Sequence, residues 1–208
     1  MNLYSYVVRY DSGFAPNPFH GFCTLATCKP RIRKSAQIGD WIVGVGSACK
    51  SVNQGGRIVY AMKVSETLSF NEYFSDKRFQ LKKPIINGSR KQARGDNIYN
   101  TASKGWTQLD SFHSNDDGSA NSDHINRDTN TNRVLISEEF IYFGKDGPFI
   151  PEELESCGKP LCHKGISESK FSGENPTDRA MIMGFIEWYD SFEEKGFISH
   201  PFDWSDTQ

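Results

Sequence analysis

The sequence lacks the features that mark several familiar protein classes. No apolar run approaches the roughly 20 residues that cross a bilayer, and the N-terminal stretch has neither the basic start nor the long apolar segment of a signal peptide. The dinucleotide motif G-x-G-x-x-G, the P-loop and the hydrolase motif G-x-S-x-G are all missing. We therefore expect a cytoplasmic protein without a membrane partner, and no nucleotide-cofactor oxidoreductase, P-loop ATPase or serine hydrolase. No cofactor is predicted.

Cysteine is scarce, with five in 208 residues, and an intracellular location disfavours a disulfide framework. Two C-x4-C pairs are present, Cys23 with Cys28 and Cys157 with Cys162, and His163 follows the second pair. Such a set can supply a tetrahedral zinc site, although paired zinc ligands are usually closer together. Because Cys23 lies in an apolar stretch, unliganded thiols are the favoured interpretation. Metal binding by these five residues stays open.

The net charge of −2 hides a division along the chain. Residues 1–94 carry 15 Lys and Arg against 5 Asp and Glu, whereas residues 146–208 carry 5 against 13. The densest basic stretch, residues 77–94, has seven positive charges and no acid. Basic side chains spaced along a loop can follow a phosphate backbone, which predicts a nucleic acid or nucleotide as partner. A solvated loop that balances the acidic C-terminal region is the alternative interpretation.

The pattern of apolar residues predicts short strands and a few short helices. Strands rich in β-branched and aromatic residues are expected at 3–9, 41–46, 57–64, 133–137 and 140–144. Helices are expected at 30–37, after Ser69, which has capping-box spacing to Glu72, and at the C-terminus within 176–195. Residues 110–132 contain almost no apolar residue and are interpreted as a polar loop insertion. One α+β domain over 1–208, built on a mixed sheet or small barrel, is therefore predicted.

Several segments together carry a family resemblance. They are CTLA at 23–26, CKPRIR at 28–33, GDWI at 39–42, GDNIY at 95–99, HS at 113–114, DT at 128–129, and VLIS through F-x-YFG at 134–144. The chain resembles the nucleotide modification associated domain family, type two, from about residue 3 to 204, and GDWI is also similar to the PUA-like superfamily (EVE, YTH and ASCH domains). The resemblance implies a PUA-like small mixed β-barrel, a modified base or nucleotide as ligand, and a role in DNA base hypermodification or phage defence.

A pocket for a flipped base needs an aromatic platform, hydrogen-bond partners for the base edge and cations for the flanking phosphates. Residue types of all three kinds are present. The candidates are Asp40, Trp41, Asp96, Asn97 and Tyr99 for the base, and Arg31, Arg33, Lys82 and Lys83 for phosphates. Core packing of Trp41, and turn hydrogen bonds by the three Asp and Asn residues, are the alternatives.

The polar insertion offers a different chemistry. His113, Asp116, Asp117, His124 and Asp128 lie within 16 positions. A histidine beside a carboxylate can act as a general base, and the same residue types can hold a divalent metal. His113 and Asp128 are the candidate acid–base pair, although no rigid helical spacing such as H-E-x-x-H links them.

Three functions therefore stay open. The first is recognition of a modified nucleobase or nucleotide in DNA or RNA. The second is an enzyme of base or nucleotide modification that uses His113 and Asp128. The third is an interaction module that binds partner proteins of a DNA-modification or defence system.

Overall fold

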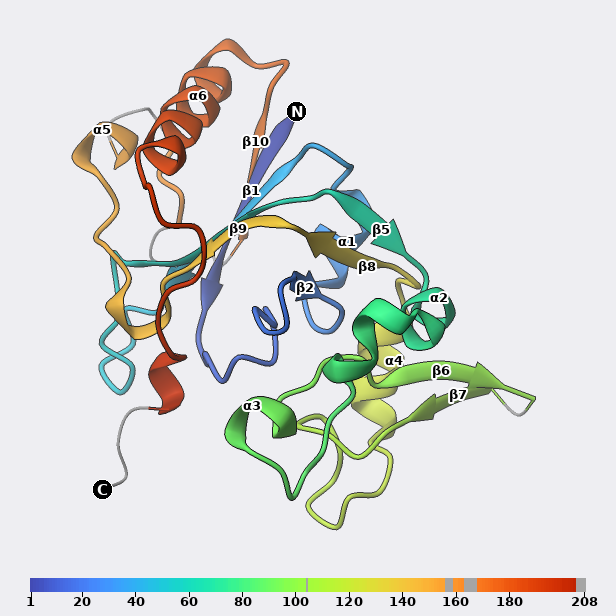
Figure 1. Cartoon of the computed structure of the whole chain (residues 1–208). Coiled ribbons are helices and arrows are strands. Elements are labelled where there is room, and N and C mark those ends of the chain that lie inside the picture. The colour runs from blue at the N-terminus through green and yellow to red at the C-terminus, as the bar shows by residue number, and fades with distance from the viewer. Residues whose placement is uncertain (104, 156–158, 163–167, 205–208) are drawn as a thin grey trace. The chain divides into compact units, whose positions relative to one another are not determined.

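The computed structural model describes residues 1–103, 105–155, 159–162 and 168–204 (Figure 1). Its chain forms two compact units, each assembled from segments that are distant in sequence. Unit 1 comprises Met1–Asp11, Ala36–Val64 and Glu139–Gln208, and unit 2 comprises Ser12–Ser35 and Ser65–Glu138. Within the described part of the chain, no helix is long and apolar enough to cross a membrane.

Unit 1 is built on a six-stranded mixed sheet. Its order is β10 (Glu168–Ser172), β1 (Asn2–Val8), β3 (Trp41–Gly46), β4 (Ile58–Lys63), β9 (Glu139–Tyr142) and β11 (Gly196–Phe197). β1 pairs with β3 and β9 with β11 in parallel, and the other neighbours are antiparallel. β3 is buried along its whole length, as its uninterrupted apolar run predicts for a central strand. The strands expected at 3–9, 41–46, 57–64 and 140–144 are therefore confirmed.

The helix α6 (Pro176–Asp190) completes the core of unit 1. Asn175 caps it by accepting hydrogen bonds from two backbone N–H groups of the first turn, and Pro176 takes the first helical position. Phe185 and Tyr189 lie on the buried face, with ring centroids 5.6 and 4.5 Å from Trp41. The C-terminal helix expected within 176–195 is thus confirmed, and it ends at Asp190.

Unit 2 has a smaller sheet and more short helices. A three-stranded antiparallel sheet has the order β2 (Cys23–Leu25), β8 (Val134–Ser137) and β5 (Glu66–Leu68), and β6 (Tyr99–Ala102) pairs with β7 (Gly105–Gln108). The helical segments are α1 (Pro30–Ser35), α2 (Phe70–Ser75), η1 (Lys77–Lys82), α3 (Arg90–Ala93) and α4 (Ser122–Thr129). The capping box at Ser69 and Glu72 is present at the start of α2, as its spacing predicts.

Two expectations need correction. The six-stranded sheet of unit 1 has β10 at one edge and β11 at the other, and the three-stranded sheet of unit 2 has β2 and β5 at its edges. Neither sheet closes into the small barrel that the resemblance implied. The polar segment 110–132 is not simply a loop, because it contains α4. Asn121 caps this helix by accepting from the N–H groups of Asp123 and His124, so capping and tertiary contacts support a helix that has few apolar residues.

Candidate active site

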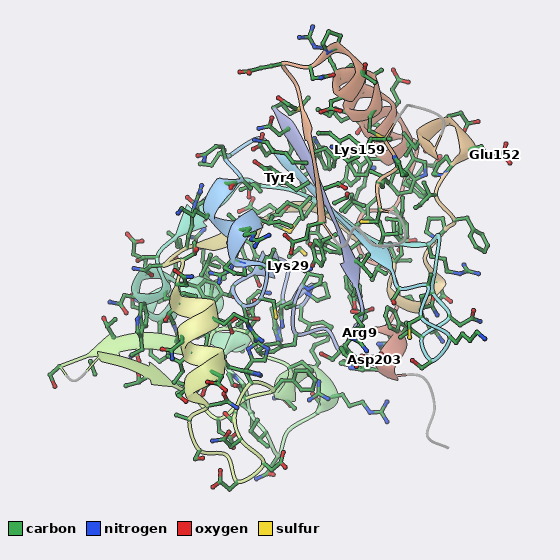
Figure 2. All side chains as sticks on the ribbon, turned by 180° about the vertical axis from the view of Figure 1, so that it is seen from behind. Tyr4, Arg9, Lys29, Glu152, Lys159 and Asp203 are labelled. Atoms are coloured by element: carbon green, nitrogen blue, oxygen red, sulfur yellow. The ribbon has the colours of Figure 1, made fainter. Side chains whose placement is uncertain are left out.

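Cys28 is half-buried in the turn between β2 and α1 of unit 2. Cys28 and Lys29 both adopt left-handed backbone conformations, with φ of 58° and 40°, which residues with side chains rarely do. The Cys28 N–H donates to Asp128 Oδ1 at 3.0 Å, and the Cys28 carbonyl accepts from Arg33 Nε at 2.8 Å. The turn is therefore held from both sides. Figure 2 labels Lys29, between the cysteine and α1.

The imidazole of His113 lies between the thiol of Cys28 and the carboxylate of Asp128. Its Nδ1 is 2.7 Å from Asp128 Oδ2, and its Nε2 is 3.7 Å from Cys28 Sγ. Asp128 is fully buried in the last turn of α4, and His113 is 6% exposed in the turn after β7. The Ser111 hydroxyl accepts from the His113 N–H at 3.3 Å and supports that turn. Three separate segments of the chain thus align a thiol, an imidazole and a carboxylate.

Both oxygens of the Asp128 carboxylate have donors. Tyr99 Oη donates to Oδ2 at 3.0 Å, so this oxygen accepts hydrogen bonds from both the phenol and the imidazole. Oδ1 accepts from the Cys28 N–H and lies 3.4 Å from Arg127 Nε. A carboxylate held in this way keeps its orientation and fixes the imidazole ring that it binds.

Arg33 joins the segments that carry the cysteine and the aspartate. Its guanidinium donates to four backbone carbonyls: Cys28 (2.8 Å), Asp128 (2.5 Å), Thr131 (2.8 Å) and Arg133 (2.7 Å). Burial lowers the pKa of Arg33 to about 10, although the Asp128 carboxylate acts in the opposite direction. Since Arg33 is fully buried on these carbonyls, its position does not fit the predicted phosphate contact.

The charges of the site favour an imidazolium. Burial opposes the charged ring, but the hydrogen bonds and charges of Asp128 and Cys28 outweigh burial and raise the pKa of His113 to about 9. Burial acts to raise the pKa of the Asp128 carboxyl, but the hydrogen bond and charge of His113, the charge of Arg127 and the Cys28 N–H together lower it. At neutral pH the site therefore holds a cation between a carboxylate and a thiol. This arrangement suits a cysteine nucleophile, whose reactive form is the thiolate.

Aromatic rings enclose the imidazole. The ring centroid of His124 is 4.2 Å from that of His113, and the ring of Phe14 is 4.6 Å from it. Burial, followed by the charge of His113, lowers the pKa of His124. Phe14 also contacts Phe112, with ring centroids 5.6 Å apart. The neighbours of His113 thus restrict its ring on two sides.

The residues predicted to bind a base are divided between the two units. In unit 1, Asp40 accepts from the N–H groups of Asn2 at 2.7 Å and Gln37 at 3.0 Å, and Trp41 is 2% exposed in the core. Lys63 Nζ lies 5.7 Å from the centroid of the Trp41 ring. For Asp40 and Trp41, the turn and core roles that were the alternatives are therefore the ones observed.

In unit 2, Asp96 and Asn97 are also buried in structural contacts. Asp96 accepts from the hydroxyls of Thr24 at 2.6 Å and Tyr73 at 2.7 Å. The Asn97 amide donates to the carbonyls of Tyr73 at 3.0 Å and Phe79 at 3.1 Å. Of the five predicted base-binding residues, Tyr99 is the one whose side chain is bonded to the candidate active site.

The remaining phosphate candidates differ in exposure. Lys82 is fully buried, with Nζ donating to the carbonyls of Asn17 and Phe22 at 3.0 Å and to Asn17 Oδ1 at 2.6 Å. Burial lowers the pKa of Lys82 to about 8. Its enclosure does not fit the predicted phosphate contact. Arg31 is exposed, and Lys83 is half-buried with Nζ 3.7 Å from the Phe74 ring centroid.

The open question of metal binding falls partly outside the described residues, which do not include Cys157 and His163. Cys23 is buried in β2, and Cys162 belongs to unit 1. Among the residues that the structure describes, no group of three or more His, Cys, Asp or Glu side chains is arranged to hold a metal ion.

The sequence indicated Cys28 as a possible metal ligand and did not connect it with His113 and Asp128. The candidate pair His113 and Asp128 was identified, but Cys28 lies 85 residues from one and 100 from the other. One local signal was available: a cysteine two residues before a proline that begins a helix, in a chain with histidine and aspartate candidates elsewhere.

These features define a mixed α/β protein with an open multi-stranded sheet in unit 1 and a cysteine–histidine–aspartate cluster in unit 2. The chain belongs to the family described as nucleotide modification associated domain 2, whose model matches residues 1–208. No curated protein and no solved structure gives a significant match to the chain. The family description associates the protein with nucleotide modification.

Proposed function

We propose that the protein is a thiol enzyme of nucleotide modification, in which Cys28 is the nucleophile, His113 the acid–base group and Asp128 the residue that orients His113. The alignment of Sγ, the imidazole and the buried carboxylate carries the proposal. The same order of groups is used by cysteine and serine enzymes on unrelated folds. The family association supplies the substrate class, a nucleotide or a base within a nucleic acid.

The chemistry that fits these groups is acyl transfer. The Cys28 thiolate attacks an acyl carbon of the substrate, a sulfur–carbon bond forms, and the carbonyl electron pair moves to oxygen. When the carbonyl re-forms, the bond to nitrogen or oxygen breaks, and His113 Nε2 gives its proton to the leaving group. Neutral His113 then takes a proton from water, whose oxygen attacks the thioester. The acid leaves, and the thiolate and imidazolium return.

Recognition of a modified base by a PUA-like domain, in hypermodification or phage defence, remains a prediction. The buried positions of Trp41, Asp96 and Asn97 give it less support than the sequence suggested. A bound base needs an accessible ring face and accessible hydrogen-bonding groups, and these side chains are buried. A role as an interaction module likewise stays a prediction.

The test is whether a substrate acylates Cys28. The full chain would be incubated with 2′-deoxynucleoside 5′-monophosphates and oligonucleotides whose bases carry an amide or N-acyl group, and intact-mass and peptide mass spectrometry would follow adducts and products. We expect a transient adduct on Cys28 and a cleaved product. Cys28→Ser should form neither a thioester nor product at a comparable rate.

His113→Asn separates nucleophile from acid–base group, because it keeps the thiol but removes the proton donor. We expect its turnover to fall by about 10²–10⁴-fold. Product formation that persists unchanged in both Cys28→Ser and His113→Asn would overturn the proposal, as would failure of every nucleotide in the panel to react.

A further inference from the structure

An exposed aromatic ring lies one side chain away from the candidate active site. Phe112 is 46% exposed, although its neighbours Ser111 and His113 are buried at 8% and 6%. Hydrogen bonds between Ser111 and Ser114 close the turn, with Ser111 N–H donating to Ser114 Oγ and Ser114 N–H to the Ser111 carbonyl, both at 3.0 Å. The same turn thus points one aromatic side chain outward and the imidazole inward.

The guanidinium of Arg94 packs against the ring of Phe112. The guanidinium carbon lies 4.5 Å from the centroid of Phe112, and the Arg94 carbonyl accepts from Asn17 Nδ2 at 2.7 Å, which fixes the backbone there. Phe14 contacts the rings of both Phe112 and His113. Phe112 and Arg94 therefore form an aromatic and cationic surface, and the buried ring of Phe14 connects Phe112 to the imidazole that faces Cys28.

We propose that Phe112 and Arg94 form the nucleotide subsite of the enzyme, with the base stacked on this surface and Arg94 near the phosphate. This inference rests on the proposed function. Stacking suits every base because each has a flat π face, and a guanidinium adds both a planar surface and a positive charge. The ligand chemistry is a single nucleotide unit, either free or within a single strand.

The molecule contains a matched control. Phe149, in unit 1, is 64% exposed, and the guanidinium carbon of Arg57 lies 4.2 Å from the centroid of its ring. This pair repeats the arginine-on-phenylalanine arrangement in the unit that does not contain His113. Phe149→Ala therefore removes an equivalent surface ring and tests whether any effect of Phe112→Ala depends on its location.

The experiment is protection of Cys28 from alkylation by iodoacetamide, followed by peptide mass spectrometry, with the exposed Cys49 of unit 1 as the internal reference. The probes are the four 2′-deoxynucleoside 5′-monophosphates, a 12-nucleotide single-stranded DNA and inorganic phosphate alone. We expect a nucleotide to slow alkylation of Cys28 but not of Cys49. Phe112→Ala should raise the nucleotide concentration that gives half-protection by about tenfold, whereas Phe112→Tyr should keep the wild-type value. Arg94→Gln should weaken protection by the probes, all of which carry phosphate.

Several outcomes would overturn the subsite. They are protection that is equal in Phe112→Ala and wild type, an equal effect of Phe149→Ala, protection by phosphate alone as strong as by nucleotides, or no protection by any probe. Protection by the oligonucleotide alone would support the subsite and identify a strand as the source. The His113→Asn variant reports separately on the proposed function: if alkylation of Cys28 without ligand is slower in this variant, activation of the thiol stands even when the subsite fails.

Discussion

The two units bury different kinds of side chain. In unit 1 the core consists of apolar and aromatic residues around a long sheet, and its buried charged groups are Asp11 and Asp40 among the described residues. Unit 2 has shorter strands and a smaller sheet, and it buries more charged side chains than unit 1. Among the described residues of unit 2, the buried Asp, His, Lys and Arg side chains are Arg33, Lys82, Asp96, His113 and Asp128. Unit 1 is thus held mainly by the hydrophobic effect, and unit 2 depends in addition on internal polar networks.

This difference has a physical meaning. A buried charge must be paired or hydrogen-bonded, because an unpaired one is strongly destabilising, so each network fixes the segments that it joins. In unit 2 the networks hold loops and short helices that apolar packing alone would leave less ordered. The side chains of the candidate active site lie among these segments, and a reactive group needs such fixed surroundings.

The largest effect is expected from Cys28→Ser. It should reduce turnover by about 10⁴-fold or more, because the nucleophile is lost, whereas the free energy of unfolding should change by less than about 1 kcal/mol. Steady-state assays on a substrate found by adduct formation, together with urea unfolding, measure the two quantities. A large loss of stability would instead place Cys28 among the structural residues of unit 2.

Lys82→Met tests the buried charge of unit 2. It should destabilise the protein by about 3–5 kcal/mol, since three oxygen acceptors lose their donor and Asp96 loses a neighbouring cation. The matched change in unit 1 is Lys63→Met. Lys63 forms an exposed ion pair of 3.1 Å with Glu139, and its loss should cost less than about 1 kcal/mol. Equal effects in chemical denaturation would contradict the comparison.

Arg33→Lys keeps the charge but removes the planar donors. We expect a loss of about 2–3 kcal/mol, because an ammonium cannot serve all four carbonyls in this geometry. Alkylation of Cys28 should also change, since Arg33 links the carbonyl of Cys28 to that of Asp128. Arg78→Lys, on an exposed pair with Glu66, is the control and should have little effect on either quantity.

A smaller effect is predicted for the protonation of His113. In Asp128→Asn the pKa of His113 should fall by about 1–3 pH units, because the charged partner is lost while burial remains. An NMR titration of the imidazole measures this directly. A value that stays near 9 would show that Asp128 is not the group that holds the proton on His113.

The sign of the pH effect on stability follows from the same shift. The pKa of His113 is raised above its unfolded value of 6.5, so its contribution is fully present below pH 6.5 and is lost as the pH rises through about 9. The free energy of unfolding of the wild type, measured between pH 6 and 9.5, should therefore decline as the pH rises. In Asp128→Asn this decline should be smaller.

The sequence predicted those parts of the fold that local patterns determine. The apolar runs predicted β1, β3 and β4, the Ser69 capping box predicted α2, and the pattern within 176–195 predicted α6. The helix α4 was missed because its sequence is almost entirely polar. Its position depends on an Asn121 cap and on contacts of Asp128 with distant residues.

The candidate site was predicted in part for the same reason. His113 and Asp128 lie close enough in sequence to be considered together, and the structure shows them hydrogen-bonded. The contact with Cys28 forms only when β2 and its following turn meet α4, which no local pattern contains. Arg33 and Lys82 illustrate the reverse error: a basic residue in a basic stretch suggests a phosphate ligand, yet both are enclosed on backbone carbonyls.

The central claim is that Cys28, His113 and Asp128 act as one unit. A double-mutant cycle on the rate of Cys28 alkylation tests it most directly, with His113→Ala, Asp128→Ala and the double variant compared at pH 7 and Cys49 as the internal reference. We predict that each single change slows alkylation of Cys28 and that the double variant is no slower than His113→Ala alone, because Asp128 acts through the imidazole. Rate losses that multiply in the double variant, or a Cys28 rate unchanged by His113→Ala, would contradict the account.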